Sequence, residues 1–180
     1  WTMWEPNAYD NDDKLYKDSG IYDTLGQLSI TYFKYKDTIL LETVGTEDYY
    51  EDYYIIPKET REVIIIEPYY YQYDGFPYIF YELSVVVPII EDSSFLGVFG
   101  VDIDLTKLSE TLNRTRLYQS GYLSLITNSG YIVTHPDTSV IGKNINQFLK
   151  ENDFLNRNTL LKGESLSLET ISEFTGKKVF

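Results

Sequence analysis

A single carboxylate interrupts an apolar run near the middle of the sequence. The run 97–103 reads GVFGVDI, and in a strand Asp102 would share one face with Val98 and Gly100. An ionised carboxylate there is costly unless a cation, hydrogen-bond donors or water at the strand's end compensate it. Asp102 therefore indicates either a site for a positively charged group or a cap for the helix predicted to follow. Asp104, which is closer to that helix, suits the capping role better.

The sequence offers little of the chemistry that catalysis or metal binding requires. It has no cysteine and one histidine, His135, so a thiolate or histidine metal cluster and a catalytic triad are excluded. The acidic run Asp10–Asp13 lacks the ligand spacing of an EF-hand loop and is predicted to be a solvated loop. The glycosylation triplet at Asn113 is attributed to chance. We predict no catalytic residue, no metal and no cofactor.

The composition is that of a folded, acidic, tyrosine-rich protein. Of 180 residues, 43% are hydrophobic and 16% aromatic, which suffices to build a core. The net charge of −13 and the lack of a Lys/Arg cluster argue against a nucleic-acid surface. No run reaches the roughly 20 apolar residues of a membrane span. Because the sequence lacks an initiator Met and stops within a strand-like segment, we interpret it as a piece of a longer protein.

Apolar runs and turn residues predict an antiparallel sheet in the first half of the chain. Asp74-Gly75, between two aromatic and β-branched runs, is a strong hairpin signal, and the other runs are mostly joined by short polar turns. Strands connected in this way pair antiparallel and do not form βαβ units. Five strands are predicted, at 28–35, 39–44, 63–73, 78–90 and 95–103, and the segments 1–24 and 45–61 are predicted to be irregular.

A helix and a second hairpin are predicted in the second half. Leu105, Leu108 and Leu112 recur at helical spacing and leave polar residues on the other face. The hairpin comprises 122–127 and 131–134, and a short helix within 148–161 packs against it. The predicted fold class is α+β, with a first module at 1–104, a connector helix at 105–119 and a partial second module at 120–180.

Several short motifs occur in a characteristic order along residues 1–150. They are Trp4-Glu5-Pro6-Asn7-Ala8-Tyr9-Asp10, Tyr53-Tyr54 with Pro57-Lys58, Glu67-Pro68-Tyr69, Pro88-Ile89, the run 97–103, Gly130, His135-Pro136-Asp137 and Ile141-Gly142. Together they resemble double Cache domains, the extracytoplasmic sensor regions of prokaryotic chemoreceptors and sensor histidine kinases.

This resemblance implies PAS-like antiparallel sheets in two modules. The module 1–104 would be the membrane-distal, ligand-binding one without its long N-terminal helix, and 120–180 would be part of the membrane-proximal one. It also implies a cell-membrane receptor that is anchored by transmembrane helices outside this sequence, senses outside the cytoplasm and forms a homodimer in its full length.

The resemblance also implies ligand-binding roles for individual positions. In amino-acid-sensing members of the family, an aspartate at the position of Asp102 meets the ligand's ammonium group. Those members hold the ligand's carboxylate with an arginine two residues before an aromatic pair, which can grip it bidentately. Aligned on Tyr53-Tyr54, that position holds Glu51. A glutamate repels a carboxylate, so two acids and an aromatic pair favour a cationic ligand.

Further aromatic residues complete the predicted site. Tyr69 occupies the position of the family's EPY tyrosine, and Tyr71 follows two residues later on the same strand face. With the aromatic pair and Tyr81 they could form a cage, although a chain with 18 tyrosines uses most of them as ordinary strand and loop residues. Trp4 resembles a signature residue that lines the pocket or, as we favour, pins the first loop onto the core. The predicted ligand-binding residues are Asp102, Tyr53, Tyr54, Tyr69, Tyr71, Glu51 and Trp4.

The sequence therefore favours a sensor region without enzymatic activity that binds a small polar ligand with a cationic nitrogen. Such a ligand would be an amine, a quaternary ammonium compound or an amino-acid derivative. The alternative is a ligand-free structural or protein-interaction module that contacts a periplasmic partner. The two hypotheses differ in whether Tyr53 and Tyr69 converge on a cavity with Asp102 or spread over an exposed face. Glycoside hydrolysis would require a pair of catalytic carboxylates, and the spacing of the acidic residues in the sequence singles out no such pair.

Overall fold

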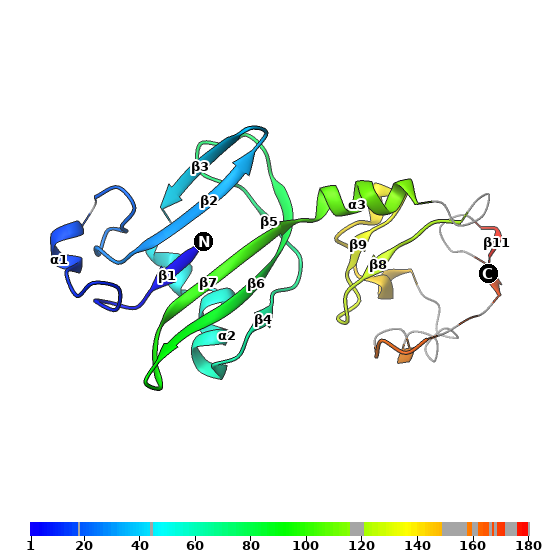
Figure 1. Cartoon of the computed structure of the whole chain (residues 1–180). Coiled ribbons are helices and arrows are strands. Elements are labelled where there is room, and N and C mark those ends of the chain that lie inside the picture. Colours follow the sequence, from blue (N-terminus) through cyan, green and yellow to red (C-terminus); the bar gives the residue numbers. More distant parts are fainter. Residues whose placement is uncertain are drawn as a thin grey trace. The chain divides into compact units, whose positions relative to one another are not determined.

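The computed structural model divides the chain into two units, Trp1–Asp104 and Leu105–Phe180 (Figure 1). Among the described residues, no helix combines the length and the apolar character that crossing a membrane requires. The structure describes residues 1–17, 19–43, 45–115, 121–148, 158–159, 162–165, 167, 169–171 and 176–179.

A seven-stranded antiparallel sheet forms the first unit. Its strands follow the order β3-β2-β1-β7-β6-β4, and β5 also pairs with β6. The predicted α+β class is confirmed, and so are the two hairpins β2–β3 and β6–β7. The elements are β1 (Thr2–Trp4), α1 (Asp13–Tyr16), β2 (Ser29–Tyr35), β3 (Thr38–Thr43), the 3-10 helix η1 (Thr46–Tyr50), α2 (Asp52–Thr60), β4 (Ile64–Ile65), β5 (Tyr69–Tyr71), β6 (Phe80–Glu91) and β7 (Ser94–Asp104).

Strand β1 lies at the centre of this sheet, between β2 and β7. Met3 pairs with Ser29 on one side and with Val98 on the other, so a three-residue strand joins the two hairpins. The prediction that segment 1–24 is irregular is wrong for β1. This strand forms because it pairs with strands that are distant in the sequence, and its own residue pattern does not indicate it. Gly97 permits the close approach, since a Cβ there would lie 2.2 Å from the carbonyl oxygen of Met3.

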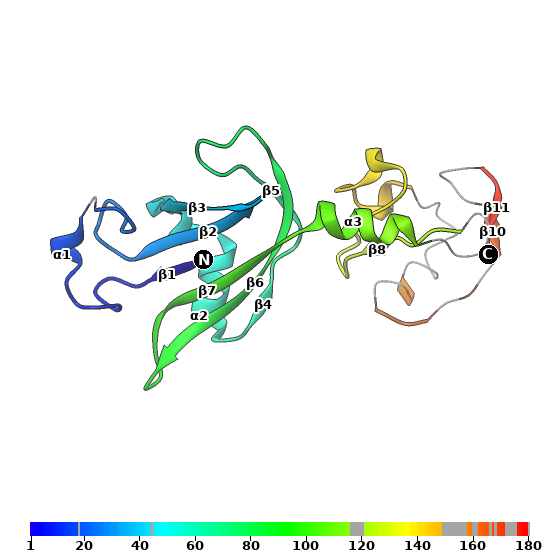
Figure 2. The same cartoon turned by 45° about the horizontal axis from the view of Figure 1, so that its top comes forward.

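The segment 45–61, predicted to be an irregular loop, is mostly helical. It contains η1 and α2, and α2 contacts β6 and β7 on one face of the sheet (Figure 2). The local pattern hides this helix because Pro57 lies inside it and removes a backbone N–H. Burial compensates for this loss: Tyr54 is 1% exposed and lies in the hydrophobic core with Val86 and Val98.

Tyr54 also links α2 to the residue that follows β1 through a polar contact. Its hydroxyl donates to the carboxylate of Glu5 at 2.5 Å, and Lys58 pairs with the same oxygen at 2.5 Å. We expect Tyr54→Phe to lower the free energy of unfolding by about 1.5–3 kcal/mol, because a hydrogen bond to a charged acceptor is lost while the ring stays packed. Urea unfolding measures this. Tyr50→Phe is the control, since Tyr50 is 80% exposed, and equal effects of both variants would contradict the assignment.

The strand predicted at 63–73 is split into β4 and β5, with a proline between them that cannot donate to the ladder. Ile65 pairs with Val85, and Tyr69 pairs with Glu82. The four-residue step from 65 to 69 therefore opposes a three-residue step from 85 to 82, which is the offset of a β-bulge. This extra residue turns Tyr69 to the sheet face that carries Glu82.

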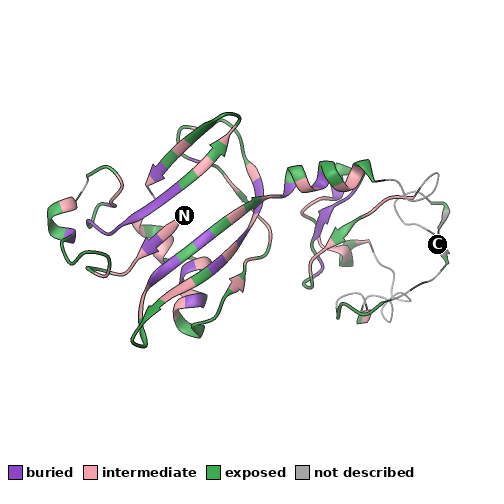
Figure 3. Cartoon of the chain, in the orientation of Figure 1, coloured by how far each residue is buried: buried purple, intermediate pink, exposed green. Residues whose placement is uncertain are grey.

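Buried and exposed residues alternate along the strands of the sheet (Figure 3). Along β7, Val98 is fully buried, whereas Phe99 and Val101 are each 50% exposed, which confirms the predicted alternation in this part of the strand. The alternation fails at Phe95, which packs against the core because a register shift interrupts the β6–β7 pairing there. One face thus holds the core and Asp102, and the other is apolar and exposed.

The second unit begins with the predicted helix. Helix α3 spans Leu105–Arg114 and contacts β9, and the hydroxyl of Ser109 donates to the carbonyl oxygen of Val133 at 3.4 Å. The predicted hairpin is confirmed as β8–β9, whereas most of the helix predicted within 148–161 lies outside the described residues. The remaining elements are β8 (Leu125–Ile126), β9 (Ile132–Thr134), the 3-10 helices η2 (Thr138–Val140) and η3 (Ile145–Gln147), β10 (Thr170–Ile171) and β11 (Lys178–Val179).

Candidate ligand-binding site

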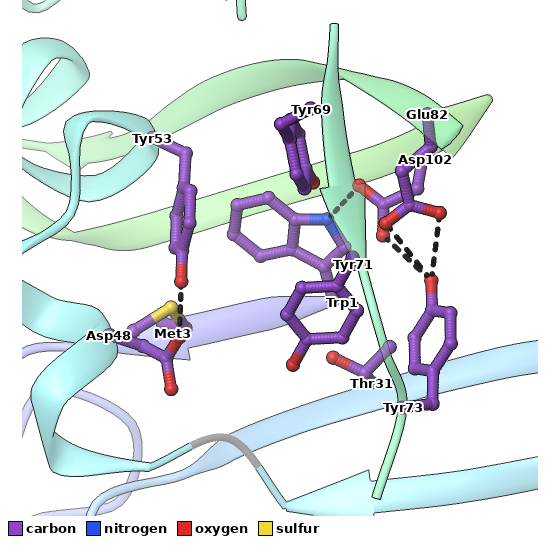
Figure 4. A pocket seen from close by; sticks show the side chains of 10 residues that line it. All are labelled: Trp1, Met3, Thr31, Asp48, Tyr53, Tyr69, Tyr71, Tyr73, Glu82 and Asp102. Carbon is purple, nitrogen blue, oxygen red and sulfur yellow. Dashed lines mark hydrogen bonds between the residues drawn. The ribbon is translucent and has the colours of Figure 1, made fainter. Parts of the chain in front are cut away.

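A pocket lies on the core-bearing face of the first unit. It holds about 340 Å³ of empty space, counting the part open to solvent. The strands of the sheet contribute six of its ten lining residues. Trp1 precedes β1, Tyr73 follows β5, and the other two come from η1 and the first turn of α2. Figure 4 shows the ten side chains that line it: Trp1, Met3, Thr31, Asp48, Tyr53, Tyr69, Tyr71, Tyr73, Glu82 and Asp102.

The register of β1 and β7 brings Trp1 to Asp102. The N–H of Gly100 donates to the carbonyl oxygen of Trp1 at 2.9 Å, so the two residues lie side by side. Gly100 and Asp102 are two positions apart and share one face of β7. The absence of a side chain at Gly100 leaves room for the indole ring, because a Cβ would lie 2.2 Å from it. The indole N–H then donates to Asp102 Oδ1 at 2.7 Å.

Asp102 is held by neutral donors. The hydroxyl of Ser84 donates to Oδ1 at 2.7 Å, and the hydroxyl of Tyr73 approaches Oδ2 at 3.5 Å. Tyr69 supports Ser84 through a hydroxyl–hydroxyl hydrogen bond of 2.7 Å. Within the described ranges, no basic side chain pairs with Asp102. The carboxylate is therefore oriented by neutral side chains. The ammonium group of Trp1 also lies near it: burial lowers the pKa of this ammonium group, and the charge of Asp102 opposes that effect.

Glu82 is a second carboxyl group next to Asp102. It is 3% exposed, and the hydroxyl of Tyr73 lies 3.3 and 3.4 Å from its two oxygens. Burial raises the pKa of Glu82 to about 8, and the negative charge of Asp102 adds to the increase. Near neutral pH Glu82 is thus largely protonated beside Asp102.

Asp48 lies on the other side of the Trp1 indole (Figure 4). The hydroxyl of Tyr53 donates to its Oδ1, and the N–H of Gly45 donates to its Oδ2 at 2.9 Å. Burial, followed by the contact with Asp48, raises the pKa of Tyr53 well above its usual value. The phenol therefore stays neutral and cannot compensate the charge of Asp48.

Four of the predicted residues, Asp102, Tyr53, Tyr69 and Tyr71, line this pocket together. The bulge before β5 explains the two tyrosines of that strand, because it turns their side chains to this face. Tyr71 also donates its hydroxyl to Glu42 at 3.4 Å. Their role in ligand binding remains a prediction.

The structure places the other predicted residues outside the lining. Glu51 is exposed where η1 meets α2, and its carbonyl oxygen accepts the first hydrogen bonds of α2. Tyr54 is buried in the core against Glu5. Trp4 is one residue out of phase with Met3, and its ring packs edge-on against Tyr9 at 5.1 Å. Tyr81 is likewise out of phase with Glu82, and its ring packs against Tyr70.

Six lining residues were not predicted: Trp1, Met3, Thr31, Asp48, Tyr73 and Glu82. One of them carried a usable signal, since Glu82 alternates with Ser84 and Val86 along an apolar strand as Asp102 does along the next. Trp1 and Met3 depend on the position of β1 in the sheet, and Asp48 depends on the path of η1. The local sequence specifies neither.

His135 and the acidic run Asp10–Asp13 lie outside the pocket lining. His135 is buried in the second unit, where its Nδ1 accepts the N–H of Asp137 at 3.0 Å and its Nε2 lies 3.1 Å from the hydroxyl of Tyr122. In the run Asp10–Asp13, Asp13 accepts the N–H of Asn7 at 2.7 Å. The described residues include no group of three or more acidic or histidine side chains placed to hold a metal ion.

The first unit is thus an antiparallel sheet with a partly open pocket on one face, and three carboxyl groups line that pocket. Residues 5–110 match the family described as methyl-accepting chemotaxis protein-like, first PDC sensor domain, and the chain belongs to this family. This match confirms the sensor-domain family that the sequence motifs resemble.

Similar proteins include a chemotaxis protein and solved sensor domains. The chemotaxis protein TlpQ of Pseudomonas aeruginosa is 24% identical over 163 residues, which are 81% of this chain and 22% of TlpQ. The extracellular domain of histidine kinase mmHK1S-Z3 is 30% identical with a TM-score of 0.85, covering 98% of this chain and 64% of that domain. The ligand-binding domain of Mlp24, solved with asparagine, is 23% identical with a TM-score of 0.52, covering 81% of this chain and 63% of that domain. The chain thus spans about a fifth of TlpQ and less than two thirds of these solved domains.

Proposed function

We propose that this chain is the extracytoplasmic sensing part of a transmembrane receptor and that its pocket binds a small organic cation. The first unit would be the membrane-distal module and the second unit part of the membrane-proximal one. The proposed activity is sensing and not catalysis. Membership of the sensor-domain family supports the receptor role, and the chemistry of the pocket supports the ligand class.

One observation carries the ligand class. Three of the ten lining residues, Asp48, Glu82 and Asp102, bear carboxyl groups, and no lysine, arginine or histidine of the described chain is among the ten. Five others, a tryptophan and four tyrosines, present aromatic rings, which attract cations by their faces. A ligand carboxylate would meet no basic partner in this lining and would be repelled by the acids. The pocket thus matches an amine or quaternary ammonium better than an organic acid or a zwitterionic amino acid.

The position of the pocket suits a signalling role. Its lining joins the central strands to the segment that carries Asp48 and Tyr53, so a bound cation would contact both parts. A ligand signals only if it binds one arrangement of the receptor more tightly than another. Attraction between a cation and Asp48 on one side and Asp102 on the other would favour the arrangement in which both parts approach each other.

The alternative function, a ligand-free interaction module, requires the tyrosines to spread over an exposed face. Tyr53 and Tyr69 instead line one pocket with Asp102, which favours ligand binding. The opposite sheet face, with Phe99 and Val101 half exposed, offers an apolar surface for another protein segment, but it carries none of the predicted ligand residues.

A thermal-shift screen of this chain against amines, quaternary ammonium compounds, amino acids and organic acids tests the proposal. We expect cations to raise the melting temperature, because a ligand at about 100 times its Kd adds about 2.7 kcal/mol to the stability of the folded state. Organic acids should have no effect at the same ionic strength. Stabilisation by organic acids alone, or by no compound in a sample that unfolds cooperatively, would refute the ligand class.

A further inference from the structure

The acids of the pocket form two separate groups. Asp102 and Glu82 lie together on β7 and β6, where both approach the hydroxyl of Tyr73. Asp48 belongs to η1 and approaches neither of them in any hydrogen bond among the described residues. We propose that the pocket takes an organic dication of the aliphatic diamine class, with one nitrogen at Asp102 and the other at Asp48. This inference rests on the proposed function and specifies its ligand.

Aromatic rings connect the two acidic groups. Asp48 accepts the hydroxyl of Tyr53, the ring of Tyr53 packs edge-on against Trp1 with centroids 5.4 Å apart, and the indole N–H of Trp1 donates to Asp102. Figure 4 shows Trp1 and Tyr71 between the two acidic groups. A ligand that bridges Asp48 and Asp102 would therefore run along ring faces, which suit a chain of methylene groups.

The charge of the pocket matches two positive charges. Asp48 and Asp102 accept hydrogen bonds only from neutral groups, and within the described ranges neither forms an ion pair. Glu82, buried beside Asp102, is largely neutral near pH 7 because its pKa is raised. A monoamine would neutralise one carboxylate and leave the other without a counterion in a partly desolvated site. A diamine neutralises both.

A ligand with one ammonium and one carboxylate suits this arrangement least. Its carboxylate would lie near Asp48 if its ammonium group met Asp102, and near Asp102 in the opposite orientation. Neither end offers a lysine or arginine among the lining residues. The same two acidic ends that attract a diamine therefore discriminate against a zwitterion.

Calorimetric titration with diamines and monoamines of equal length tests the inference. The diamines are 1,3-diaminopropane to 1,6-diaminohexane, and each is compared with the n-alkylamine of the same carbon number. We expect one diamine length to bind at least tenfold more tightly than its monoamine. Asp48→Asn should abolish that difference while monoamine affinity changes less than threefold. Glu47→Gln is the matched control, because Glu47 lies next to Asp48 in η1 but is exposed and outside the lining.

The outcomes separate this inference from the proposed function. Equal binding of monoamines and diamines, or an unchanged preference for diamines in Asp48→Asn, overturns the dication and leaves the cation sensor intact. Binding of neither class overturns both proposals. A thermal unfolding curve of each variant confirms that it is folded, and Asp48→Glu, which restores the charge, should recover part of the preference.

Discussion

Replacing Asp102 by asparagine is expected to weaken the binding of an organic cation about 100-fold. The reason is that Asp102 supplies a charge that neutral donors orient but do not compensate. Removing one partner of a desolvated, hydrogen-bonded charge pair costs about 2–5 kcal/mol in binding, and about 2.7 kcal/mol corresponds to 100-fold. The effect should appear as a higher Kd in calorimetric titration with a quaternary ammonium probe or an amine.

Asparagine is chosen because it can preserve the structure around the site. Its amide oxygen can accept from Trp1 and Ser84 as the carboxylate does, and its NH₂ group can donate toward Glu82. Asp37→Asn, an exposed change of equal charge in the β2–β3 turn, is the control and should leave the Kd within twofold. If both variants bind the probe as the parent does, Asp102 is not the cation's partner. A melting temperature close to that of the parent establishes that a loss of binding is not a loss of folding.

Short-range signals account for the parts of this fold that were predicted. The β2–β3 and β6–β7 hairpins and α3 follow from turn residues and from apolar periodicity, which act within a few positions. Asp102 stood out because a carboxylate breaks an apolar strand, and Tyr69 because of a family motif. A sequence pattern can predict these features because they depend on residues that are close together in the sequence.

The parts that were missed depend on contacts between distant segments. Strand β1 is three residues long and exists through its pairing with β2 and β7, and without it Trp1 has no position in the pocket. Helix α2 forms despite its proline because Tyr54 is buried. The sequence also suggested an acid near the aromatic pair, at Glu51, whereas the lining carboxylate is Asp48, three residues earlier. Aligning a family motif to a segment without a regular pattern cannot distinguish positions three residues apart, because the path of η1 determines which side chain faces the pocket.

Cation binding is expected to become tighter as the pH rises toward 8. Without a ligand Glu82 has a pKa of about 8, because it is buried and because the negative charges of Asp102 and Asp104 add to the effect of burial. A cation bound next to it favours the carboxylate and lowers this pKa, so binding below pH 8 releases a proton. The affinity should therefore increase by up to about tenfold per pH unit between the pKa of the complex and pH 8. Above pH 8 it should level off, because the free protein has then already lost the proton.

The raised pKa of Glu82 also makes the stability of the unliganded protein depend on pH. Since folding raises the pKa of Glu82 from its usual value of 4.5, its contribution to stability is complete below pH 4.5 and is lost as the pH rises to about 8. The empty domain should thus lose stability over the same range in which it gains affinity for a cation. Burial of Glu82 beside Asp102 causes both trends, so both should disappear when Glu82 cannot titrate.

Titration with a quaternary ammonium probe at pH 6, 7, 8 and 9 measures this coupling, because the probe itself does not titrate. Repeating each titration in two buffers of different ionisation enthalpy counts the protons released. Glu82→Gln should flatten the pH dependence and abolish the proton release, since the amide keeps the size of the side chain but has no proton to lose. An affinity of the parent protein that is constant from pH 6 to 9 would show that binding does not change the protonation of Glu82. The proposed coupling between Glu82 and the bound cation would then be wrong.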